Sequence, residues 1–102
     1  MQRWKARDLE PFARGIFEAV GTEPDIAGVV AGHLVRSNLS GHDSHGVIRV
    51  MQYVTQIEEG EIAPSARPEV LRASGATWLI DAHRGFGHHS TAWTLDWAIE
   101  RA

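Results

Sequence analysis

The sequence predicts an α+β fold in two parts, a helical subdomain over residues 1–62 and the beginning of a mixed α/β domain over residues 63–102. In the first part, apolar residues recur three and four positions apart, as they do on the buried face of a helix. In the second part, two short runs with the character of β-strands follow a connector that contains Pro64 and Pro68. We therefore expect three helices, then a β-hairpin, then one more helix.

The composition is typical of a globular protein. The chain has 102 residues, of which 43% are hydrophobic and 23% are charged, and this is enough for one small domain with a core. The net charge of −3 comes without a basic cluster, so we expect no nucleic-acid partner. No apolar run approaches the ~18 residues of a membrane span, and no signal peptide is evident, so we expect no membrane partner. The absence of cysteine excludes disulfides and fits a cytoplasmic protein.

The first helix has a start signal and a stop signal. Residues 1–7 are expected to form a short lead, after which Asp8 can cap a helix over residues 9–20. Gly21 is expected to end that helix, because glycine readily takes the left-handed conformation that follows a helix end.

The second helix is expected to begin after Thr22, whose hydroxyl would serve as N-cap, with Pro24 in the first turn. It should run to about Ser40. His33 is expected on its surface with a structural or solvent-facing role.

The third helix is expected over Gly46–Glu59. Its apolar residues form one stripe at helical spacing, made of Val47, Val50, Met51, Val54 and Ile57. His45, Arg49 and Tyr53 are four residues apart, so they should fall together on the opposite face, away from the core. There they can present an imidazole, a guanidinium and a phenol to one ligand. The alternative is a solvated polar face without a function.

The second part begins with an extended connector over residues 61–68. The runs 69–73 and 77–81 are expected to pair as a hairpin around Ser74-Gly75-Ala76. A helix over residues 88–102 should follow, with Trp93 and Trp97 one turn apart. This helix lacks a stop signal, so we expect the chain to be truncated.

One motif has a specific resemblance. Asp43-Ser44-His45-Gly46, followed by Arg49 and Tyr53, resembles the signature of the type-2 malate/L-lactate dehydrogenase family. The resemblance extends over nearly the whole chain, from the segment before the motif (Ser37 to Gly41), through Gly60 and Pro64, to Asp81 and Gly85-Phe86-Gly87. One departure is Ala82-His83-Arg84, where the family more often has glycine or small polar residues. The resemblance implies a fold that is not of the Rossmann type.

The resemblance also implies an activity. Members of this family transfer a hydride between NAD or NADP and a small 2-oxo or 2-hydroxy carboxylate, and the full-length enzymes are usually homodimers. His45 would then be the proton donor, with Ser44 beside it to bind substrate or relay the proton. Arg49 would bind the substrate carboxylate, and Tyr53 would contribute to the pocket wall. The chain would be an N-terminal portion, inactive alone, because most of the cofactor-binding segment lies outside it.

Several of these residues also allow other interpretations. Asp43 and Ser44 can instead cap the third helix. Gly85-Phe86-Gly87 lacks the third glycine of a dinucleotide fingerprint, so we expect a tight turn rather than a cofactor-binding loop. Six histidines raise the question of a metal, but their spacing does not match a zinc site, and we expect none. The rival function is a truncated, non-catalytic interaction or oligomerisation module that uses the surface around Trp93 and Trp97.

Overall fold

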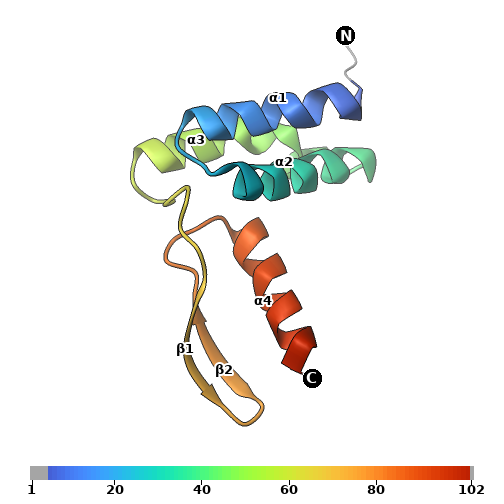
Figure 1. Ribbon diagram of the computed structural model, residues 1–102. Coiled ribbons are helices and arrows are strands. Elements are labelled where there is room, and N and C mark those ends of the chain that lie inside the picture. The colour runs from blue at the N-terminus through green and yellow to red at the C-terminus, as the bar shows by residue number, and fades with distance from the viewer. Residues whose placement is uncertain (1–4, 102) are drawn as a thin grey trace.

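The computed structural model describes residues 5–101, and in it a layer of three helices adjoins a hairpin and a fourth helix (Figure 1). The elements in chain order are α1 (Ala6–Ala19), α2 (Pro24–Leu39), two 3-10 turns (Asp43–His45 and Val47–Arg49), α3 (Val50–Glu58), β1 (Glu69–Ser74), β2 (Thr77–Asp81) and α4 (Gly87–Arg101). The predicted α+β class is confirmed. The described strands form one antiparallel pair and not a parallel doubly wound sheet. The division between residues 62 and 63 stays a prediction.

The core lies within the helical layer. It consists of buried apolar residues from α1, α2 and α3 together with one residue from beyond β2, namely Ala13, Phe17, Ile26, Ala27, Val30, Ala31, Leu34, Val50, Val54 and Phe86. Ala27 and Ala31 lie one turn apart on α2 and are fully buried. Their small side chains leave room for neighbouring elements to pack closely against α2.

The starts of α1 and α2 differ from the predictions. Helix α1 begins at Ala6, so the expected lead is wrong for residues 6–7, and residues 1–4 lie outside the described residues. Its first turn is closed by the Lys5 carbonyl, which accepts the N–H groups of Asp8 and Leu9. Asp8 therefore lies inside the first turn, where a carboxylate complements the helix dipole.

Helix α2 has no side-chain cap at its N-terminus. Its N-cap is Glu23 in an extended conformation, with Pro24 as the first helical residue. The predicted capping role of Thr22 is wrong, because its hydroxyl is buried and has no hydrogen-bond partner among residues 5–101.

The third helix starts later than predicted. Gly46 is extended, with φ −97° and ψ −151°, and it separates two short 3-10 turns. Continuous α-helix begins only at Val50. The expected apolar stripe is therefore incomplete: Val50 and Val54 are buried, but Met51 is 66% exposed.

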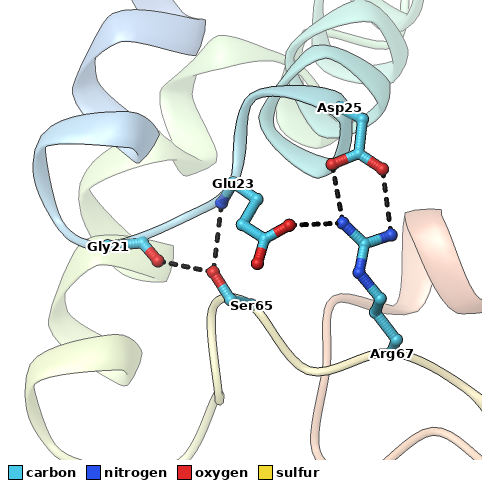
Figure 2. A network of polar contacts seen from close by, with 5 residues as sticks. All are labelled: Gly21, Glu23, Asp25, Ser65 and Arg67. Carbon is cyan, nitrogen blue, oxygen red and sulfur yellow. Dashed lines mark hydrogen bonds and ion pairs between the residues drawn. The ribbon is translucent and has the colours of Figure 1, made fainter.

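The connector after α3 is bound to the turn between α1 and α2 by a polar network (Figure 2). The Ser65 hydroxyl donates to the Gly21 carbonyl at 2.6 Å and accepts from the Glu23 N–H at 3.1 Å. The Arg67 guanidinium donates two hydrogen bonds of 2.9 Å to Asp25 and one of 2.6 Å to Glu23. The hydrogen bond from Arg67 lowers the pKa of the Asp25 carboxyl.

The same connector contacts the turn before α4. The Ala63 N–H donates to the Arg84 carbonyl at 2.9 Å, and a Cβ at Gly85 would lie 2.9 Å from the Ala66 carbonyl oxygen. The connector can therefore approach the turn this closely only if residue 85 is glycine. His83 and Arg84 have left-handed φ values of 53° and 62°, a conformation that favours glycine.

The hairpin matches the prediction and supports α4. Strands β1 and β2 pair from Glu69 with Asp81 to Ser74 with Thr77, with an irregularity near Leu71. Trp78 on β2 meets Trp97 on α4 edge-on, with ring centroids 5.1 Å apart. The Arg101 guanidinium lies 3.7 Å from the Trp97 ring centroid. The predicted Trp93/Trp97 surface is therefore partly covered by the chain itself.

Phe86 joins the second part of the chain to the helical core. Its ring is 2% exposed and contacts Phe17 at 5.4 Å and Tyr53 at 6.0 Å between centroids. Tyr53 is half-buried against the same core, so the prediction that it points away from the core is wrong. None of the described helices combines the length and the apolar character needed to cross a bilayer.

The substitution Phe86→Ala should lower the free energy of unfolding by about 3–5 kcal/mol, because it removes a buried aromatic ring and leaves a cavity. Urea denaturation followed by circular dichroism measures this change. Leu79→Ala is the matched control, since Leu79 is 53% exposed on the hairpin and should cost less than about 1 kcal/mol. Similar losses for the two variants would contradict the role given to Phe86.

Candidate active site

A polar cleft lies where α2, the two 3-10 turns, α3 and the start of α4 meet. Its volume is about 470 Å³, which is within the range of small-molecule sites. It is lined by His33, Ser37, His42, His45, Arg49, Gln52, Tyr53 and His88.

The cleft brings together three of the four residues singled out from the sequence. His45, Arg49 and Tyr53 all line it, although they do not share one helix as predicted. Ser44 lies instead beside a smaller hollow next to Arg49 and Gln52.

Two histidines that the sequence did not point to also line the cleft. His33 was expected on the surface but lines the cleft. The sequence predicts for His88 only a position at the start of the helix over residues 88–102, yet His88 also lines the cleft. Its position depends on how Phe86 anchors α4, and local spacing carries no signal for that contact.

Asn38, near the end of α2, holds the turn that carries His45. Its side-chain amide donates to Asp43 at 2.8 Å and accepts the N–H of Val47 at 2.9 Å. A Cβ at Gly46 would overlap this amide, so only glycine lets the turn pass so close. Asp43 therefore acts as a structural partner of Asn38, and the alternative that Asp43 and Ser44 cap the third helix is wrong, because neither makes a side-chain cap there.

His45 has a defined neighbour on one ring nitrogen. The Ser44 hydroxyl lies 3.1 Å from its Nδ1 atom, and this contact orients the ring. The other ring nitrogen, Nε2, can then exchange a proton with a ligand in the cleft. Either partner can be the donor between Ser44 and Nδ1, because the direction depends on the state of the ring.

Arg49 is fixed by two hydrogen bonds. Its Nε donates to the Ser44 carbonyl at 2.7 Å, and its Nη1 donates to the Gln52 side chain at 2.6 Å. A guanidinium has five N–H groups, so the Nη1–Nη2 edge can still bind an anion. This edge is the one available for a carboxylate.

His88, half-buried at the start of α4, faces two other rings. The His33 ring centroid is 5.6 Å away and the Tyr53 centroid is 5.7 Å away. Burial lowers the pKa of His88, and the neighbouring His33 lowers it further. This imidazole is therefore neutral at physiological pH.

The turn before α4 does not fit a dinucleotide. Between its two glycines, Phe86 is buried in the helical core, and Gly85 is backed by the Ala66 carbonyl. These groups therefore serve packing. The prediction of a tight turn at this position agrees with this geometry.

The cleft contains four imidazoles, from His33, His42, His45 and His88. Within residues 5–101, however, no group of three or more His, Cys, Asp or Glu side chains is arranged to hold a metal ion. The chemistry that the cleft offers is proton transfer, anion binding and hydrogen bonding.

Comparisons with known proteins agree on one family. The family described as Malate/L-lactate dehydrogenase matches residues 4–102. Hydroxycarboxylate dehydrogenase B of Escherichia coli K12 is 32% identical over 98% of this chain and 28% of its own length. L-lactate dehydrogenase of Cupriavidus necator is 35% identical over 87% of this chain and 26% of its own length. The malate dehydrogenase structure from Entamoeba histolytica superimposes with a TM-score of 0.92 at 29% identity, covering 99% of this chain and 28% of that one.

The chain thus spans little more than a quarter of the length of these relatives.

Replacing Asn38 with Leu should lower the free energy of unfolding by about 1–3 kcal/mol, because the Val47 N–H loses its acceptor. Hydrogen exchange at the Val47 amide should accelerate, and exchange measured by NMR tests this directly. Ser40→Ala is the control, since Ser40 is exposed just beyond α2. Unchanged protection of Val47 in Asn38→Leu would contradict the role of this side chain.

Proposed function

Because the chain belongs to the malate/L-lactate dehydrogenase family, we propose that it carries the substrate-binding and proton-transfer part of an enzyme that interconverts 2-oxo acids and 2-hydroxy acids. The observation that supports this most strongly is the placement of His45 and Arg49 in one cleft of suitable size. An anion-binding group and a proton donor are the two groups that reduction of a 2-oxo acid requires from the protein.

In the proposed reaction, the Nη1–Nη2 edge of Arg49 binds the substrate carboxylate and so orients the adjacent carbonyl. As the carbonyl is reduced, negative charge develops on its oxygen, and Nε2 of His45 donates a proton to that oxygen. In the oxidation direction the same nitrogen accepts the proton from the hydroxyl.

Ser44 and Tyr53 have supporting roles in this proposal. The Ser44 hydroxyl holds Nδ1 of His45 at 3.1 Å, and its backbone carbonyl holds Nε of Arg49. One residue therefore positions both functional side chains and can relay a proton to the imidazole. Tyr53 forms a wall of the cleft and is fixed there by Phe86.

NAD or NADP is the proposed hydride source, as in dehydrogenases of this kind. The turn before α4 is built for packing, so most of the dinucleotide-binding segment is proposed to lie elsewhere in a longer chain of which this is the N-terminal portion. The chain's small share of its relatives' length supports this arrangement, and alone it would be inactive. We further propose a helical subdomain over residues 1–62, an α/β domain from residue 63 onward, a homodimer, and a cytoplasmic location.

An interaction module is the second candidate. Four large apolar side chains on the hairpin and α4 are more than half exposed, namely Leu71, Leu79, Leu95 and Ile99. These residues can contact another protein segment. This surface is compatible with the enzyme proposal, because the remainder of a longer chain can cover it.

In the protein that the complete gene encodes, His45→Ala should lower kcat by roughly 10²–10⁴-fold, because the proton donor is lost. The assay follows consumption of NADH or NADPH with a set of 2-oxo acids. Binding of the acids, measured by calorimetry, should change little and serves as the control for folding. Full activity in this variant would remove His45 from the proposed role.

Arg49→Gln should act mainly on substrate binding, raising KM for 2-oxo acids by at least roughly tenfold, because a neutral amide cannot replace the charged clamp. The same assay over a range of substrate concentrations gives KM and kcat separately. Glu58→Gln is a control at an exposed position on α3. An unchanged KM in Arg49→Gln would contradict carboxylate binding by this residue.

A further inference from the structure

His88 occupies the wall between the polar cleft and a second, apolar hollow. The hollow, of about 510 Å³, runs along α4 and is lined by Gly87, Thr91, Ala92 and Leu95 together with His33 and His88. Arg49 and Gln52, in contrast, border the small hollow beside Ser44 and Ile48. The cleft therefore has a cationic side at Arg49 and an uncharged side at His88.

The buried nitrogen of His88 determines which atom faces a ligand. Its Nδ1 is buried and has no hydrogen-bond partner in the described part of the chain. A buried N–H without an acceptor is costly, so the favoured neutral form leaves Nδ1 unprotonated and places the hydrogen on Nε2. Since Nδ1 is buried, Nε2 is the ring nitrogen of His88 that remains for a ligand, and it offers one N–H donor.

We propose that Nε2–H of His88 binds an uncharged oxygen on the carbon chain of the substrate, so that the enzyme prefers 2-oxo acids with a hydroxyl or carbonyl group beyond C2. This rests on the proposed function, because it assumes that Arg49 binds the carboxylate at the other side of the same cleft. His88 is then a specificity-determining residue, distinct from the proton donor His45.

The surroundings of His88 favour an uncharged oxygen over a second carboxylate. The rings that face it belong to His33 on α2 and Tyr53 on α3, and among the residues that line the cleft Arg49 alone is a lysine or arginine. A second carboxylate there would lose hydration without a cation to compensate. A simple alkyl group would leave the N–H of His88 without an acceptor. A site that offers such a donor therefore disfavours substrates that carry an alkyl group at this position.

The test uses two 2-oxo acids of almost equal size, 3-hydroxypyruvate and 2-oxobutyrate, which differ by a hydroxyl in place of a methyl. The enzyme encoded by the complete gene is compared with His88→Phe, His88→Gln and Thr91→Val. Phenylalanine keeps the ring contacts and removes the N–H, whereas glutamine keeps an N–H donor. Thr91 lines the apolar hollow but not the polar cleft, and it is the control on the same helix. Turnover is measured with NAD(P)H, and binding of each acid is measured by calorimetry.

The proposal expects the unmodified enzyme to favour 3-hydroxypyruvate. In His88→Phe, kcat/KM for 3-hydroxypyruvate should fall about five- to tenfold, the usual effect of losing one uncharged hydrogen bond, and the value for 2-oxobutyrate should stay within about twofold. His88→Gln should restore part of the preference, and Thr91→Val should retain it.

Other outcomes separate the two proposals. Equal losses for both acids, or an unchanged preference in His88→Phe, would overturn the role of His88 while leaving the proposed function in place. A greater loss for oxaloacetate than for 3-hydroxypyruvate would show that this side of the cleft binds a carboxylate, and would also overturn it. If the unmodified enzyme neither binds nor reduces any of these acids, the proposed function fails, and this inference fails with it.

Discussion

The contact of Phe86 with Phe17 and Tyr53 is the constraint on which the rest of the structure depends. The hairpin is two-stranded, and such a pair has little stability in water by itself. Phe86 buries its ring in the helical core and so attaches the turn before α4 to the three helices. Two residues later in the chain, His88 is placed against Tyr53 and His33. One buried ring therefore both stabilises the fold and closes one wall of the cleft.

A second constraint acts at the other wall. The side chain of Asn38 hydrogen-bonds to Asp43 and to the Val47 N–H, and these bonds hold the segment before α3. Gly46 provides the space that the Asn38 amide needs. The resulting pair of 3-10 turns directs His45 and Arg49 into the cleft from separate short elements. A continuous helix would have placed both on a face opposite the core. The polar motif is thus positioned by one asparagine on α2 as much as by its own sequence.

The parts of the fold that local sequence determines were predictable. Periodicity identified the helices, and the β-like runs identified the hairpin within one residue of its observed bounds. The motif identified His45, Arg49 and Tyr53 as neighbours, and the cleft contains all three. The misplacements have a common cause. The helix start at Val50, the burial of Tyr53 and the positions of His33 and His88 all depend on contacts between residues distant in the chain, which periodicity cannot express.

The division of the cleft into a charged and an uncharged side follows from which elements supply it. Arg49 comes from the turn held by Asn38. This turn is open to solvent, so the Arg49 guanidinium can stay charged although its two hydrogen-bond partners are uncharged. His88 comes from the helix attached through Phe86, where burial keeps its imidazole neutral. A substrate bound between them experiences a charge at its carboxylate and only hydrogen bonding at its other end. Changes at the start of α4 can therefore alter which substituent is accepted without disturbing the proton donor, because the contacts of Ser44 and Asn38 that hold His45 and its turn do not involve α4.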